Sequence, residues 1–312
     1  MIISASYKTD IPAFYGRWFS NRLKAGYCKT VNPLNRRVST VSLRRDDVDG
    51  FVFWSKNVEP FLPQLDDVRS KGFPFVLQLT INGYPRALET SVVDAARAIE
   101  SAHNVASAFG TNVVVWRYDT IVFSSLTTPE FHVDNFSALA AAMKGATNEV
   151  VVSFAHVYDK TRRNLNESAA RVGFEWSDPS DNSKRALLAR LTRIANDNSL
   201  RVSVCSQKSY IIDGVSEARC IDASRLSLVA GCRIVAKTKG NRDECLCSES
   251  RDIGAYDTCP HGCVYCYAVQ NRDLAMSRFR KHDPDSDFLF APDESHEKAD
   301  RARMQPGLFD ES

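Results

Sequence analysis

Three cysteines near the C-terminal end of the chain, Cys259, Cys263 and Cys266, have the spacing C-x3-C-x2-C. A short loop with this spacing can turn three thiolates towards one point. There they can bind three irons of a cubane and leave the fourth iron open to another ligand. Gly262 relieves the steric limits on so tight a loop. The spacing predicts a 4Fe–4S cluster, and zinc, which also binds clustered cysteines, is the alternative.

A second group of cysteines precedes this loop. We predict that four of them form a site for a second iron–sulfur cluster or for zinc: Cys205, Cys220, Cys245 and Cys247. The alternative is that they are small buried side chains, as free cysteines often are. Cys232 is predicted to pack against apolar neighbours, and Cys28 is predicted to be a lone thiol.

Short apolar runs alternate with helical stretches in the first two thirds of the chain, and these runs must position the cysteines. The runs are Ile2–Ser6, Phe51–Ser55, Phe75–Ile81, Asn112–Tyr118, Val150–Phe154 and Leu200–Cys205. They are rich in Val, Ile and Phe and short enough to be buried strands. Strand–helix alternation predicts an α/β fold with a parallel sheet. Six such units indicate a partial (βα)6 TIM-like barrel, and a flat doubly wound sheet is the competing architecture.

Each of these runs ends in polar or aromatic residues. In parallel βα folds the site lies at the C-terminal ends of the strands, so we expect these residues to line one shared opening. The candidates for binding a cofactor are Lys56, Asn57 and Ser153. The alternative is that the strands simply end in polar loops.

Four residues after the fourth and fifth runs are candidate catalytic residues. Arg117 can hold a carboxylate or phosphate with its planar guanidinium, although an ion pair with Asp119 explains it equally well. His156 and Tyr158 are candidate proton or hydrogen donors. A partly buried structural histidine is the alternative for His156.

The alternation of strands and helices stops at about residue 210. We therefore divide the chain into a partial barrel (1–210), an irregular cysteine-rich segment (211–282) and a mobile polar tail (283–312). The tail contains Gln305-Pro306-Gly307-Leu308-Phe309, a Q-x-x-L-F pattern. It is similar to the peptide by which bacterial DNA-repair and replication proteins bind the sliding clamp, where a Leu–Phe pair fills an apolar pocket.

The composition limits the class of protein. With 44% hydrophobic and 25% charged residues, the chain of 312 residues resembles ordinary soluble proteins. It has no stretch approaching a membrane span and no signal-peptide pattern at Met1–Ser6, so we expect a cytoplasmic protein with no membrane partner. In that compartment clustered cysteines indicate metal binding or redox chemistry rather than disulfides. The net charge of +2 gives no general argument for nucleic-acid binding.

The cysteine loop, with Tyr265 before its last cysteine, resembles the motif of the radical S-adenosylmethionine superfamily. The resemblance implies that the three cysteines bind the cluster and that S-adenosylmethionine binds the fourth iron. It further implies that electron transfer cleaves this cofactor to a radical that abstracts hydrogen from a substrate. In most of that superfamily the loop follows the first strand and a Gly-Gly-Glu-like segment follows the second. Here the loop follows the sixth strand, and the second ends in Trp54-Ser55-Lys56-Asn57.

A closer resemblance covers nearly the whole chain. It rests on Asp10–Tyr15, Phe53–Asn57, Trp116–Asp119 and the stretch from Asp252 to Ala268 with its three cysteines. These segments resemble the bacterial domain-of-unknown-function 1848 family, whose C-terminal cysteines are similar to the radical S-adenosylmethionine motif. The resemblance supports a cluster and names no substrate.

These patterns lead to one main expectation and two alternatives. We expect a radical S-adenosylmethionine-type enzyme that receives electrons from a donor such as flavodoxin or ferredoxin. The clamp-like peptide favours DNA or a nucleotide as the substrate. The alternatives are a non-catalytic iron–sulfur protein that binds nucleic acid or acts as a sensor, and a zinc-dependent βα-barrel hydrolase.

Overall fold

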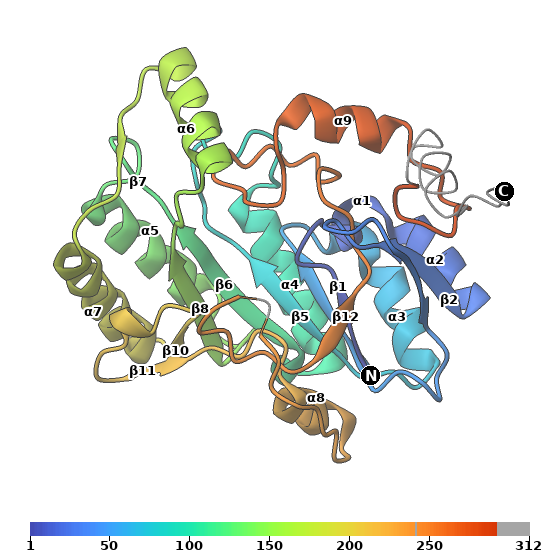
Figure 1. Cartoon of the computed structure of the whole chain (residues 1–312). Coiled ribbons are helices and arrows are strands. Elements are labelled where there is room, and N and C mark those ends of the chain that lie inside the picture. The colour runs from blue at the N-terminus through green and yellow to red at the C-terminus, as the bar shows by residue number, and fades with distance from the viewer. Residues whose placement is uncertain (241, 292–312) are drawn as a thin grey trace, which may run out of the picture.

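Six buried strands run parallel to one another at the centre of the computed structural model, which describes residues 1–240 and 242–291 (Figure 1). They are β1 (Ile2–Ala5), β4 (Gly50–Ser55), β5 (Phe75–Thr80), β6 (Val114–Ile121), β8 (Glu149–Phe154) and β10 (Arg201–Val204). Five of them lie within one residue of a predicted apolar run, and β6 extends three residues past the end of its run at Tyr118. The short strands β11 (Val215–Glu217) and β12 (Ser250–Asp252) add parallel edges beside β10 and β1.

The order of the strands distinguishes the two predicted architectures. From one edge to the other the sheet runs β11-β10-β8-β6-β5-β4-β1-β12, so the six main strands keep their order in the chain. Such an order is that of a βα barrel, whereas a doubly wound sheet reverses at a switch point. Among the described residues β11 and β12 each pair with one neighbour only, so the barrel is open. The predicted α/β class and partial barrel are confirmed, and the doubly wound alternative is wrong.

Helices cover the outer face of the sheet. The longer ones are α2 (Gly16–Ala25), α3 (Leu62–Ser70), α4 (Ala95–Phe109), α5 (Pro129–Ala142) and α7 (Asp181–Asp197). Helix α6 (Asp159–Val172) instead lies above the strand ends (Figure 1), where Ser168 Oγ donates to the Ala87 carbonyl at 2.9 Å. The short helices are α1 (Ile11–Phe14), η1 (Glu59–Phe61), η2 (Thr111–Val113) and η3 (Lys208–Tyr210). Alternate strand residues such as Phe53 and Trp116 pack outward, against Phe61 and Phe136. No helix in the described part of the chain is long and apolar enough to cross a membrane.

Two small antiparallel pairs lie outside the main sheet. One joins β2 (Tyr27–Val31) to β3 (Val38–Ser42), and the other joins β7 (Phe123–Ser124) to β9 (Trp176–Ser177). The first pair contacts the end of the described chain, because Asp287 binds both Arg22 of α2 and Lys29 of β2. Leu289 is also buried. The predicted mobile tail therefore does not hold for residues 283–291, and the clamp-like peptide at residues 305–309 lies outside the described residues.

The inner face of the open barrel has two layers. Towards the start of the strands it is apolar, and Ile2, Val76 and Val115 contact Ile221 and Leu226 of the C-terminal segment. Towards the strand ends it becomes polar. The inward-facing residues there include Ser4, Gln78, Arg117 and Ser153. The C-terminal segment therefore fills the apolar half of the inner face, and the polar half is left to form a site.

The segment predicted to be irregular contains four regular elements. These are β11, α8 (Ala223–Ala230), β12 and α9 (Arg272–Arg280). Between β11 and β12 the chain passes from one edge of the sheet to the other. Asp252 fixes its arrival beside β1, because its carboxylate accepts hydrogen bonds from Ser4 Oγ (2.8 Å), Ser6 Oγ (2.9 Å) and the Tyr7 amide (3.1 Å). No apolar run marks β11 or β12 in the sequence, because these edge strands are short and polar.

His132 of α5 makes the stability of this fold depend on pH. Its ring is fully buried between Tyr118 Oη and the Val122 carbonyl, and burial lowers its pKa from 6.5 to about 4. As the pH falls from 6.5 to about 4, the unfolded chain takes up a proton that the folded chain does not. The free energy of unfolding therefore falls by about 3 kcal/mol across this window, because the pKa of His132 is about 2.5 lower in the folded chain than in the unfolded chain. Urea unfolding at pH 7 and pH 4.5 should show a smaller loss in His132→Asn than in the wild type; equal losses would contradict this assignment.

Candidate functional site

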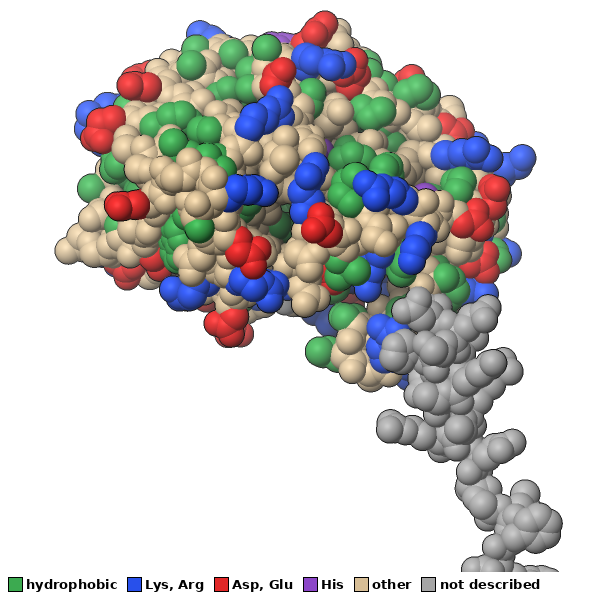
Figure 2. Space-filling model, turned by 90° about the horizontal axis from the view of Figure 1, so that it is seen from above, with side chains coloured by type: hydrophobic (Ala, Val, Ile, Leu, Met, Phe, Trp, Pro, Cys, Tyr) green, Lys and Arg blue, Asp and Glu red, His purple; other side chains and the backbone are tan. Residues whose placement is uncertain are grey.

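A cavity of about 460 Å³ lies at the C-terminal ends of the strands. All six main strands contribute to its wall, through Ser6, Ser55, Thr80, Arg117, Ser153 and Cys205 among others. Figure 2 looks down on this end of the molecule, where Lys and Arg side chains are grouped across the middle of the face with Asp and Glu between them. The polar strand ends thus share one opening, as the sequence pattern predicts.

The cysteine loop (residues 259–266) forms one wall of this cavity. Cys259, Cys263 and Cys266 all line it. The loop is joined to the segment after β5 by main-chain hydrogen bonds, from Ser91 N to His261 O (2.8 Å) and from Val264 N to Leu88 O (3.1 Å). The segment between β5 and α4 therefore sets the position of the three thiols.

Asp10 fixes the loop from the side of β1. Its carboxylate accepts hydrogen bonds from the Ala13 amide (2.9 Å), Ser55 Oγ (2.8 Å) and the Lys56 amide (2.7 Å). It also lies 2.7 Å from His261 Nε2, inside the cysteine loop. The Nδ1 of the same ring is buried and has no hydrogen-bond partner among the residues that the structure describes.

The place of the loop in space differs from its place in the sequence. The loop comes after the sixth main strand along the chain, but it directly follows β12, which pairs in parallel with β1. It is therefore a loop at the C-terminal end of a strand, beside the first strand. The sequence order alone hides this, because β12 is an edge strand of three residues.

A buried carboxylate that the sequence analysis missed stands next to the cysteines. Glu89 Oε1 lies 2.8 Å from Lys56 Nζ, accepts a hydrogen bond from Asn82 Nδ2 (3.1 Å) and contacts Tyr265 Oη. Burial raises the pKa of Glu89, but Lys56 together with the hydrogen bonds from Tyr265 and Asn82 outweighs burial and holds this pKa below its usual range. Burial likewise lowers the pKa of Lys56, but Glu89, with a smaller contribution from Asp119, outweighs burial and raises this pKa overall. Both groups are therefore charged.

No pattern in the sequence marks Glu89 or Asn82. Both lie in the long connection between β5 and α4, outside the strand ends that the sequence pattern marks. Lys56, predicted to bind a cofactor, lines the cavity, and its ammonium group donates a hydrogen bond to Glu89 Oε1. Asn57, predicted for the same role, is not among the cavity residues. Its main-chain N–H donates a hydrogen bond to Ser55 Oγ.

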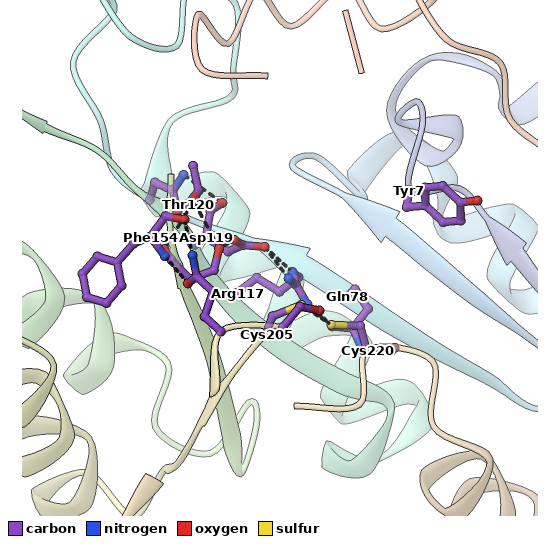
Figure 3. Close-up of polar contacts among 12 residues, drawn as sticks. Tyr7, Gln78, Arg117, Asp119, Thr120, Phe154, Cys205 and Cys220 are labelled. Carbon is purple, nitrogen blue, oxygen red and sulfur yellow. Dashed lines mark hydrogen bonds and ion pairs between the residues drawn. The ribbon is translucent and has the colours of Figure 1, made fainter. Parts of the chain in front are cut away.

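Arg117 and Asp119 form the ion pair that the sequence analysis kept as an alternative (Figure 3). Arg117 Nε lies 2.9 Å from Asp119 Oδ2, and its Nη1 reaches Gln78 Oε1 (3.2 Å) and Cys220 Sγ (3.0 Å). Burial raises the pKa of Asp119, but Arg117 together with the hydrogen bond from Ser153 outweighs burial and lowers this pKa overall. Arg117 is thus engaged within the protein, and Asp119 carries negative charge into the cavity.

The remaining candidates also line the cavity. Ser153 Oγ contacts Asp119 and lies 3.1 Å from Thr120 Oγ1. His156 Nε2 lies 3.3 Å from Gln207 Nε2, and burial lowers the pKa of His156, which favours its neutral form. Tyr158 is largely exposed at the edge of the cavity. The structure brings these residues together, and their catalytic roles stay predictions.

The second thiol group (Cys205, Cys220, Cys245 and Cys247) lines the same cavity. Cys205 Sγ and Cys220 Sγ are 3.3 Å apart, and the Cys247 thiol is hydrogen-bonded to those of Cys220 and Cys245. Cys232 is exposed and Cys28 is buried in the outer core. Among the residues that the structure describes, no three His, Cys, Asp or Glu side chains surround a single point that a metal ion would occupy.

The side chains around the cysteine loop suit an iron–sulfur cluster. The loop supplies three thiols, which the structure joins in no disulfide. Burial raises the pKa of Cys259 to about 12 and that of Cys263 well above its usual range, so these thiols stay protonated unless a cation binds. The Ala268 amide lies 3.3 Å from Cys266 Sγ, and donors of this kind stabilise bound thiolates.

The fold and the site together define an open parallel βα barrel with a thiol-lined cavity at its strand ends. The chain belongs to the family described as domain of unknown function DUF1848, whose model matches residues 2–268. No curated protein matches the chain. A crystal structure of D-hydantoinase is similar at 11% identity and a TM-score of 0.30, covering 66% of this chain and 41% of that one. The chain thus spans less than half of that protein, and so loose a superposition supports no argument.

Proposed function

We propose that the cavity holds a 4Fe–4S cluster on Cys259, Cys263 and Cys266 and binds S-adenosylmethionine beside it. The observation that carries the proposal is the position of the cysteine loop. It follows a strand at the β1 edge and faces a cavity large enough for a further ligand. This position supports the resemblance to the radical S-adenosylmethionine enzymes despite the late place of the loop in the sequence.

The protein's own side chains would orient both groups. When bound, the cluster supplies an electron that cleaves S-adenosylmethionine and starts hydrogen abstraction from a substrate. Glu89 and Asp10 hold the loop from two sides, through Lys56, Tyr265 and His261. The amino-acid part of S-adenosylmethionine carries an ammonium and a carboxylate, and the cavity wall offers Asp119 for the first and Lys8 for the second.

A nucleotide or DNA is the substrate class that the edge of the cavity favours. Besides the buried Tyr265, four tyrosines line the cavity: Tyr7, Tyr158, Tyr256 and Tyr267. The ammonium groups of Lys8 and Lys160 lie 5.6 and 5.8 Å from the centre of the Tyr256 ring. Aromatic faces beside positive charge are typical of sites on which bases stack next to phosphates.

The test is anaerobic reconstitution with iron and sulfide, followed by reduction with flavodoxin or dithionite in the presence of S-adenosylmethionine. We expect formation of 5′-deoxyadenosine, and more of it when an oligonucleotide is added than when a peptide is added. The control is the triple variant Cys259→Ala, Cys263→Ala, Cys266→Ala, which should form none.

Three other outcomes would overturn parts of the proposal. One is a cluster whose spectrum does not change when S-adenosylmethionine is added, together with no more 5′-deoxyadenosine than the triple variant forms. This outcome would favour the non-catalytic iron–sulfur protein. Zinc in place of iron in anaerobically purified protein would favour the hydrolase. Equal stimulation by oligonucleotide and peptide would contradict a nucleotide or DNA substrate, but it would not contradict the cluster chemistry.

A further inference from the structure

We propose that Cys205, Cys220, Cys245 and Cys247 bind a second, thiolate-ligated metal centre in the inner layer of the barrel. This centre is separate from the cysteine loop and does not depend on the proposed function. The four thiols come from three segments that are far apart in the sequence: the end of β10, the residues after β11 and the loop before β12. The open barrel brings them to one place.

The contacts between these sulfur atoms are close and continuous. Cys205 Sγ lies 3.3 Å from Cys220 Sγ, and Cys247 links Cys220 to Cys245. In the structure the sulfur atoms form a row. Cys245 and Cys247 lie on a loop outside any named strand or helix, so side-chain rotation there can bring the row around a metal. If these cysteines were only small buried side chains, nothing would require four thiols to lie in one row.

The nitrogen donors around the row are the second, independent observation. Arg117 Nη1 lies 3.0 Å from Cys220 Sγ, and Arg242 Nη2 lies 3.4 Å from Cys205 Sγ (Figure 3 shows Arg117 beside the first two cysteines). The main-chain amide of Ile221 donates to Cys247 Sγ at 3.4 Å. Neutral thiols are weak acceptors that gain little from guanidinium groups, whereas metal-bound thiolates are stabilised by such donors.

A buried cysteine elsewhere in the chain shows the contrast. Cys28 is also fully buried, but it belongs to the apolar core of the outer face, among residues such as Phe19 and Val41. The row of four thiols instead borders a polar cavity. We therefore assign the row to a thiophilic metal. Zinc and an iron–sulfur cluster share this four-thiolate chemistry, and the experiment separates them.

The experiment uses the full chain with Cys259, Cys263 and Cys266 replaced by alanine, so that only the second thiol group can bind a cluster. One sample receives Zn²⁺ alone and another receives iron and sulfide, both anaerobically, and the retained metal is measured after gel filtration. We expect retention of one of the two, at about one zinc per chain or with iron and sulfide in equal amounts. Adding Cys220→Ser should abolish it.

Two controls keep the result interpretable. Cys232→Ser changes an exposed cysteine outside the cavity and should leave the retained metal unchanged. Cys245→Ser alters a less buried member of the row, so it should lose metal even if Cys220→Ser unfolds the chain; circular dichroism reports folding. Retention of neither metal, or equal retention with and without Cys220→Ser in folded protein, overturns the proposal. Neither result bears on the cluster of the cysteine loop.

Discussion

Replacing Glu89 with alanine should lower the free energy of unfolding by about 3–5 kcal/mol, because it leaves the Lys56 ammonium buried without its partner. The Glu89 side chain is only 4% exposed and that of Lys56 13%, so water cannot compensate for the lost carboxylate. Tyr265 and Asn82 lose an acceptor at the same time. Urea unfolding followed by tryptophan fluorescence measures the loss.

A surface pair provides the matched control. Glu59 binds Arg97 at 2.7 Å, but their side chains are 47% and 63% exposed, so Glu59→Ala should cost less than about 1 kcal/mol. The double variant Lys56→Met, Glu89→Met should recover part of the stability lost in Glu89→Ala, since no charge is left buried. If Glu89→Ala is no more destabilising than Glu59→Ala, the buried pair does not hold the structure together.

Glu89 also shows the limit of prediction from the sequence. The six strands follow from apolar runs, because a strand buried on both faces needs consecutive apolar residues. The shared cavity follows too, since parallel strands end on the same side. A single carboxylate in a long connection has no periodic pattern, and only its tertiary contacts with Lys56 and with Tyr265 of the cysteine loop make it a buried ion-pair partner.

The edge strand β12 escaped prediction for a related reason. It has three residues and its pairing depends on Asp252, whose partners Ser4 and Ser6 are far away in the sequence. Long-range polar contacts of this kind are not encoded in local patterns. Once β12 is placed beside β1, the cysteine loop and the second thiol group border one cavity, although they are separated in the sequence.

Asp10→Ala should be the second strongly destabilising change, and it should also weaken binding of any cluster in the cysteine loop. The carboxylate joins three parts of the site: the start of α1 at Ala13, the end of β4 at Ser55 and Lys56, and the loop at His261. An N-terminal cap alone is worth about 1 kcal/mol. Each further hydrogen bond to a charged group adds about 1.5–3 kcal/mol, so we expect a total loss of at least about 3 kcal/mol.

Thr128→Ala separates capping from the other roles of Asp10. Thr128 caps α5 by accepting a hydrogen bond from the Phe131 main-chain amide at 3.2 Å. Thr128→Ala should therefore lower the free energy of unfolding by about 1 kcal/mol and leave the amount of bound iron unchanged. Asp10→Asn should fall between the two. Its amide oxygen can still accept from Ala13 and Ser55, while its NH2 group cannot accept from Lys56 N or His261 Nε2. If Asp10→Asn retains full iron after reconstitution while Asp10→Ala loses it, the His261 contact does not position the loop, and the effect of Asp10 on the cluster comes from the fold of α1 and β4.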